Sequence, residues 1–117
     1  MNRLCLEKFK SAWAAEDYPA LAECLHNDIV YYASIGPEPG KSWRGKSQVL
    51  SGIKKMIAHD HATAQMGEIY ETGNVIFWTW EYFDKTTGAP IAKGCDIFHF
   101  KQGLILKKDA YRKVFHD

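Results

Sequence analysis

No apolar stretch in this 117-residue sequence is long enough to cross a bilayer, and neither sign of charge is in clear excess. A membrane-spanning helix needs roughly 20 consecutive apolar residues. Fifteen lysines and arginines stand against 14 aspartates and glutamates, which gives a formal net charge of +1. Nucleic-acid-binding domains instead gather an excess of basic residues on one face. We therefore expect neither a membrane nor a nucleic-acid partner.

Cysteine is also scarce in this sequence. The three cysteines are widely spaced and form no CxxC pair; they are Cys5, Cys24 and Cys95. An odd number in this spacing argues against a disulfide framework and predicts buried thiols of a reduced protein. The N-terminal residues include charges and lack the long apolar core of a signal peptide. Together these features predict a cytoplasmic protein.

The chain length suits one domain over residues 1–117. Apolar spacing predicts helices and strands, the helices over residues 3–15, 19–26 and 47–57 and the strands over residues 28–34, 62–72, 75–83, 91–100 and 104–115. Asp17 and Ser47 are the expected N-caps of the second and third helices. Residues 35–45, rich in glycine and proline, form the expected loop. Helices segregated from a largely antiparallel sheet define an α+β domain.

The order of these elements resembles the nuclear transport factor 2-like superfamily, particularly its SnoaL-like branch. Two segments carry the resemblance: a Gly…Trp-Arg-Gly-Lys stretch in residues 40–46, and an Asp-x-Phe-x-Phe…Gly-x-Ile hairpin in residues 95–105. The resemblance implies a cone-like, curved, mixed and largely antiparallel sheet wrapped around about three N-terminal helices. It also implies an apolar pocket and often a homodimer. It selects no reaction, because members range from ketosteroid isomerase and polyketide cyclases to non-catalytic binding modules.

Asp96 is the leading catalytic candidate. Strand alternation places it on the same face as Phe98 and Phe100, so its carboxyl group shares an apolar surface. Burial there would raise its pKa and let it donate a hydrogen bond to a developing oxyanion. The alternative is a carboxylate paired with a nearby lysine or arginine, or one that lies at the pocket mouth. The sequence leaves these alternatives open.

The resemblance also shows what is missing. The tyrosine of ketosteroid isomerase on the first helix falls at Phe9, and its catalytic aspartate falls at Ala33, so we do not expect that mechanism. Limonene epoxide hydrolase, another member, has a pocket tyrosine that resembles Tyr31, but its other catalytic residues are not retained. Tyr31 remains as a candidate that supports Asp96.

Aromatic residues supply the expected wall of the pocket. Trp78, Trp80 and Tyr82 alternate along one strand and therefore share a face. The expected ligand-binding residues are Phe9, Trp13, Trp78, Trp80, Tyr82, Phe98, Lys108 and Arg112. The three rings on one strand either line an open pocket or fill it as a core. Lys108 and Arg112 either meet Asp96 or an acidic ligand group, or extend to the rim or the dimer surface, which is the interpretation we favour.

No metal site or cofactor is expected. His59 and His61 flank Asp60, but they fall at a helix-to-strand turn and no third ligand is identifiable nearby. No nucleotide-binding fingerprint and no Ser-His-Asp arrangement is present.

The opposite, outer face of the sheet predicts a homodimer. Its expected residues form an apolar patch that usually marks an interface; they are Phe77, Thr79, Glu81, Phe83, Ile97, His99, Ile105 and Tyr111.

Taken together, the sequence features predict a protein that binds a small apolar molecule. If it is an enzyme, we expect isomerisation, cyclisation or dehydration by proton transfer. The alternative is a non-catalytic dimeric module with a filled pocket that acts through protein contacts.

Overall fold

The computed structural model describes residues 2–35, 40–58 and 62–115. Three helices are present there: α1 (Asn2–Ala15), α2 (Tyr18–Glu23) and α3 (Lys46–Ala58). The six strands are β1 (Leu25–Tyr32), β2 (Ser42–Arg44), β3 (Ala62–Thr72), β4 (Val75–Asp84), β5 (Pro90–Lys101) and β6 (Leu104–Val114). The predicted α+β class is confirmed, and the four strands from β3 to β6 agree closely with the predicted ranges.

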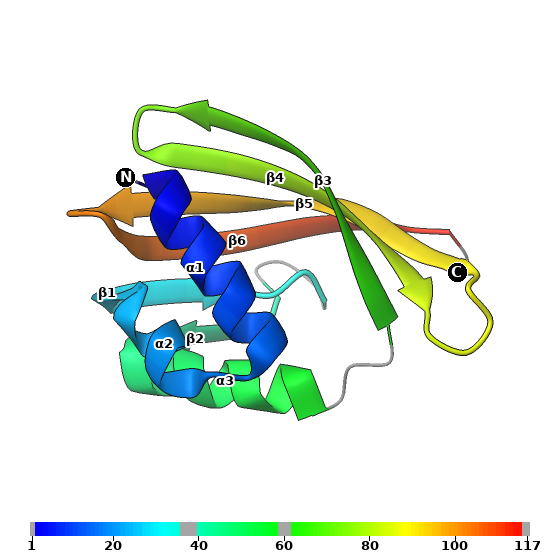
Figure 1. Ribbon diagram of the computed structural model, residues 1–117, viewed down its shortest axis with the longest axis horizontal. Coiled ribbons are helices and arrows are strands. Elements are labelled where there is room, and N and C mark those ends of the chain that lie inside the picture. Colours follow the sequence, from blue (N-terminus) through cyan, green and yellow to red (C-terminus); the bar gives the residue numbers. More distant parts are fainter. Residues whose placement is uncertain (1, 36–39, 59–61, 116–117) are drawn as a thin grey trace.

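The strands form one curled sheet in the order β2-β1-β6-β5-β4-β3. β1 runs parallel to β6, and all other neighbouring pairs are antiparallel. Figure 1 shows α1 lying across the sheet, with α2 and α3 grouped near β1 and β2, while β3, β4 and β5 extend past the helices. The mixed, largely antiparallel sheet with N-terminal helices agrees with the expected cone-like fold.

The core lies between the helices and one face of the sheet. On α1, Leu6, Phe9 and Ala12 recur at helical spacing and are buried. They pack in one cluster with residues of α3 and of the inner sheet face, among them Ile53 and Phe98. The face of the sheet that contacts the helices is called the inner face below, and the opposite face is called the outer face.

The second helix ends earlier than predicted, and the first strand begins earlier. Cys24 already terminates α2, and Leu25 pairs with Ile105 of β6. The Ile105 amide also donates to the Cys24 carbonyl oxygen at 2.9 Å. These sheet contacts outweigh the helical spacing of the apolar residues, because tertiary pairing overrides local propensity.

The expected loop over residues 35–45 contains a short strand, β2, that the sequence did not reveal. It pairs with the end of β1, where Trp43 lies opposite Tyr31. Ser47 is not the cap of α3, since the helix starts one residue before it. Gly45, at φ +83°, precedes the helix instead, in the left-handed region that glycine favours.

A bulge corrects one face assignment. The register between β5 and β6 shifts between His99 and Phe100, so that Phe100 pairs with Ile105 while His99 pairs with Lys107. An extra residue in β6 reverses the alternation at that point. Ile105, which strict alternation placed on the outer face, is therefore fully buried in the core.

The N-cap of α2 gives a direct stability test. The Asp17 side chain accepts a hydrogen bond from the Ala20 amide at 3.1 Å. We expect Asp17→Ala to lower the free energy of unfolding by about 1 kcal/mol, because the amide loses its acceptor. Asp17→Asn keeps an acceptor and should retain most of that stability. Urea unfolding measures both variants, and equal losses in the two would contradict the capping role.

Candidate active site on the inner face of the sheet

The inner face brings together side chains from four strands, as alternation predicted. Trp80 on β4 and Phe98 on β5 are buried there. Asp96 is on β5, two residues before Phe98, and is the register partner of Trp78. On β6, Lys108 is the register partner of Phe98 and also of Tyr31 on β1. The structure therefore places a carboxylate, an ammonium group and a phenol on one aromatic surface.

Lys108 connects these polar groups. Its Nζ donates a hydrogen bond to the Tyr31 hydroxyl oxygen at 2.7 Å and lies 3.6 Å from Asp96 Oδ1. Lys108 is only 6% exposed. The extension of Lys108 to the rim, which we favoured from the sequence, is therefore wrong. A lysine stem is long enough to reach a rim, but the inward-facing strand position and the Asp96 carboxylate hold its ammonium group inside.

Asp96 acts as an acceptor in this arrangement. Its Oδ1 accepts a hydrogen bond from Trp80 Nε1 at 3.0 Å and is also the atom nearest to the Lys108 ammonium. Of the alternatives left open by the sequence, the structure supports a carboxylate paired with a lysine. Among the described residues, the second carboxylate oxygen, Oδ2, has no hydrogen-bond partner.

The environment keeps Lys108 charged and Tyr31 neutral. Burial alone would lower the pKa of Lys108, but the Asp96 carboxylate and the Tyr31 oxygen beside the ammonium group outweigh it and raise that pKa. Burial raises the pKa of Tyr31, and the Lys108 charge opposes this only in part. At neutral pH the site therefore holds an ammonium group that donates to a protonated phenol.

Aromatic rings enclose this polar group. The Lys108 Nζ lies 4.2 Å from the centre of the Tyr31 ring and 6.0 Å from that of Trp13. Such positions over ring faces favour a cation. Phe9 of α1 packs edge-on against both Trp13 and Phe98. The predicted residues Phe9, Trp13 and Phe98 thus lie in one cluster around Lys108.

Trp80 is fixed by contacts that the sequence did not reveal. Its ring stacks on Tyr82 with centroids 4.4 Å apart. A Cβ atom on Gly94, the register partner of Trp80, would lie 2.8 Å from the indole carbons and would collide with the Tyr111 carbonyl oxygen. Gly94 therefore lets the indole lie flat against β5. A glycine inside a strand, next to an expected pocket, is the signal that could have indicated this close approach.

The exposure of the rings is uneven. Trp80 is 4% exposed and Phe98 2%, so these two fill space, whereas Trp13, Trp78 and Tyr82 are half-buried. Arg112, the remaining predicted residue, is half-buried and pairs in register with Gly94, away from the Lys108 network. The network thus joins Tyr31, Trp80, Asp96 and Lys108 but not Arg112.

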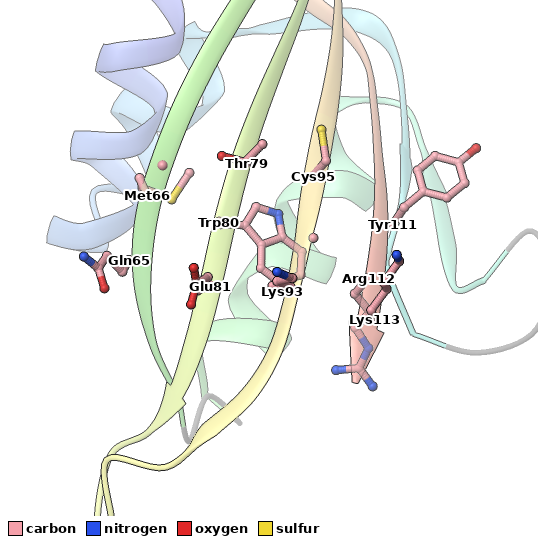
Figure 2. A pocket seen from close by; sticks show the side chains of 12 residues that line it. Gln65, Met66, Thr79, Trp80, Glu81, Lys93, Cys95, Tyr111, Arg112 and Lys113 are labelled. Atoms are coloured by element: carbon pink, nitrogen blue, oxygen red, sulfur yellow. The ribbon is translucent and has the colours of Figure 1, made fainter. Parts of the chain in front are cut away.

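A hollow of about 730 Å³ lies elsewhere on the sheet. Figure 2 shows its lining residues on four neighbouring strands, β3 to β6, with Trp80 at the centre. The lining residues with exposed side chains include Glu81, Lys93 and Tyr111, all on the outer face, while Trp80 is buried. The hollow therefore opens on the outer face, which is the surface predicted to form the dimer.

Two further expectations concern metals and membranes. Within the part of the chain that the structure describes, no three histidine, cysteine or acidic side chains gather closely enough to hold a metal ion. His59 and His61 lie outside the described residues. None of the described helices has the length and apolar character needed to traverse a bilayer.

The buried ion pair predicts a non-additive mutational effect. Lys108→Met leaves the Asp96 carboxylate buried without a counter-charge and should destabilise the fold by roughly 3–5 kcal/mol. Asp96→Leu should have a comparable effect for the opposite reason. The double variant removes both charges and should recover most of the loss, because an apolar pair of similar volume is often tolerated. Urea unfolding of all four proteins gives the coupling energy, and simple addition of the two single losses would contradict the pairing.

Comparison with known proteins agrees with this architecture. A crystal structure of a nuclear transport factor 2-like protein of unknown function from Mesorhizobium loti superposes with a TM-score of 0.79 at 18% identity, covering 96% of this chain and 90% of that chain. A protein from Sinorhizobium meliloti assigned as a polyketide cyclase gives 0.76 at 18% identity, covering 91% and 92%. A steroid delta-isomerase from Pseudomonas aeruginosa gives 0.75 at 16% identity, covering 96% and 79%. At these identities the likeness concerns the fold alone.

The sequence itself also carries a family signal. Among curated proteins, none matches the chain. The family model described as the SnoaL-like domain, however, matches residues 6–108, a range that runs from the buried Leu6 of α1 to Lys108 of the inner network. From this match and the nuclear transport factor 2-like fold, the chain belongs to the SnoaL-like domain family.

Proposed function

We propose that this protein binds a small, largely apolar molecule with a carbonyl or hydroxyl group at the inner face and catalyses a proton transfer on it. The reaction class would be isomerisation, cyclisation or dehydration. Among the similar folds are a protein assigned as a cyclase and a protein described as an isomerase, which supports the class but not the substrate.

The observation that carries the proposal is the buried group of Lys108, Asp96 and Tyr31. An ion pair inside an aromatic core adds little stability, because desolvation offsets most of the attraction between the charges. The Lys108 and Asp96 side chains are only 8% and 14% exposed. A charged group retained in such a setting is a frequent property of catalytic sites.

The geometry favours roles for Tyr31 and Asp96 that differ from those expected from the sequence. The Tyr31 hydroxyl accepts a hydrogen bond from Lys108, and its own proton has no acceptor among the described residues. The neighbouring ammonium charge strengthens this O–H group as a donor to a developing oxyanion. Asp96, with Oδ2 free of partners in the described part of the chain, would accept the substrate proton.

Three half-buried rings would hold the apolar part of the ligand. Trp13, Trp78 and Tyr82 retain partial exposure; Trp78 and Tyr82 lie on the same inner face as Asp96, and Trp13 lies on α1, the helix packed against that face. Flat apolar molecules bind such rings through their buried area and edge contacts. Access to Tyr31 requires movement of the enclosing rings, of which the Trp80–Tyr82 stack is the part next to Asp96.

One observation favours the alternative of a non-catalytic module. Trp80 and Phe98 are almost fully buried and occupy space that a ligand would otherwise fill. In that case Lys108, Asp96 and Tyr31 would be a structural network, and the work of the protein would lie in contacts made by its surface.

A binding screen separates these two functions. Thermal shift assays would test hydrophobic ketones, phenols and lactones against the wild type, Tyr31→Phe and the matched outer-face control Glu81→Gln. A ligand at about 100 times its dissociation constant should stabilise the fold by roughly 2.7 kcal/mol. We expect the shift to persist in Glu81→Gln and to fall in Tyr31→Phe. Solvent-deuterium exchange at the α-carbon of a bound ketone, abolished by Asp96→Asn, would then report proton transfer. The absence of any shift in cooperatively melting wild type would support the non-catalytic module.

We further propose that the protein forms a two-fold homodimer through the outer face. Tyr111 is 56% exposed there, next to the hollow, while Phe77, Phe83 and Ile97 are half-buried apolar side chains on the same face. Such a surface is typical of an isologous interface.

Sedimentation tests the dimer. We expect a dimer at micromolar concentration for the wild type and a shift toward monomer for Tyr111→Glu, which places a charge in the interface. The exposed Leu4 lies on α1, the helix that packs against the inner face, and offers Leu4→Glu as a control. A wild-type protein that sediments as a monomer would contradict this assembly.

A further inference from the structure

Two of the three cysteines meet in the core, although 19 positions separate them in the sequence. Cys5 lies on α1, and its Sγ is 3.6 Å from the carbonyl oxygen of Cys24, the residue that terminates α2. The Cys24 Sγ in turn donates to the Ala20 carbonyl oxygen at 3.5 Å, and the two cysteine side chains lie close enough that each shifts the pKa of the other. The third cysteine, Cys95, lies on β5 and takes no part in this contact.

The pair sits where several elements join. Cys5 is 9% exposed and Cys24 is 3% exposed. The Cys24 carbonyl oxygen also accepts the Ile105 amide, which fixes the start of β6 against β1. A bond between these two residues would therefore attach α1 to the junction of α2, β1 and β6.

The two sulfur atoms are chemically unequal. The hydrogen bond from Cys5 lowers the pKa of Cys24, burial opposes this effect, and the Lys8 charge assists it. The pKa of Cys5 is raised, because its proton is engaged with Cys24 and because the thiol is buried. Cys24 is thus the better nucleophile of the two, and Cys5 is placed to resolve an oxidised Cys24.

We propose that Cys5 and Cys24 form a reversible redox site that a small hydroperoxide converts to a disulfide. This inference is independent of the function proposed for the inner face. A small oxidant suits the site because both sulfurs are largely buried. Both thiols are free and buried in the reduced fold.

The chemistry balances in two steps. The Cys24 thiolate attacks one peroxide oxygen, the O–O bond breaks, and Cys24 becomes a sulfenic acid while the leaving hydroxide takes up a proton to form water. The Cys5 sulfur then attacks the Cys24 sulfur, the S–O bond breaks, and the departing hydroxide takes the Cys5 proton and leaves as water. Two thiols and one hydrogen peroxide therefore give one disulfide and two waters.

The bond would restrain the helix that covers the inner site. Cys5 lies one helical turn before Phe9, and Phe9 packs on Trp13 and Phe98. A cross-link at Cys5 removes freedom from the unfolded chain between the two cysteines and limits local opening of α1 in the folded state. Oxidation would therefore stabilise α1 over the aromatic cluster.

The test treats the folded, reduced full chain with a small molar excess of hydrogen peroxide. We expect the intact mass to fall by about 2 Da and the free thiols to fall from three to one. Peptide mapping should link Cys5 to Cys24. The melting temperature should rise by on the order of 10 °C and return on reduction with dithiothreitol. Amide exchange in α1 should slow in the oxidised protein.

Two variants serve as controls. Cys95→Ser should oxidise as the wild type does, whereas Cys5→Ser should accumulate sulfenic or sulfinic acid at Cys24 without the internal link. Three results would overturn the proposal: no Cys5–Cys24 link in folded wild type, a link that involves Cys95 instead, or a link that forms only under denaturing conditions. None of these results bears on ligand binding at the inner face.

Discussion

A charge pair inside an aromatic core is the interaction on which the rest of the site depends. The Lys108 ammonium group is buried and needs compensation, which Asp96 supplies as a counter-charge and Tyr31 as a hydrogen-bond acceptor. Trp80 in turn donates to the same Asp96 oxygen, and its indole reaches that position because Gly94 leaves room for it. The bulge in β6 lets Ile105 and Lys108 both face inward, so the apolar core and the charged site occupy one surface. A change at any of these positions is expected to affect the others.

Much of this fold could be predicted from periodicity. Strand alternation placed Trp78, Trp80 and Tyr82 on the inner face, and the meander from β3 to β6 agrees with the predicted ranges within one or two residues. The missed features depend on contacts distant in sequence. β2 exists because it pairs with β1, and the early start of β1 depends on β6. The position of Ile105 follows from a bulge that no local pattern revealed.

The residues of the candidate site could be predicted from the sequence, but the contacts between them could not. Asp96, Tyr31 and Lys108 were all named from sequence, but which cation would face Asp96 depends on the register of β5 and β6. From the sequence, Lys108 and Arg112 are equivalent candidates, because alternation places both side chains on the same face of the strand. Only Lys108 lies beside both β1 and Asp96, whereas Arg112 lies four residues farther along the strand, opposite Gly94. Which of two long side chains on one face contacts a given partner is known only when the register with the neighbouring strand is known.

The charge state of Lys108 tests this account most directly. In protein labelled with ¹⁵N at the lysine Nζ, with Lys108 assigned from the Lys108→Met spectrum, its proton loss would be followed as pH rises. The account predicts that Lys108 stays protonated above its ordinary pKa of 10.5, because Asp96 and Tyr31 stabilise the ammonium form against burial. Asp96→Asn should then lower that pKa. A Lys108 that loses its proton below 10.5 in the wild type, or that titrates identically in Asp96→Asn, would show that the ion pair does not organise the site.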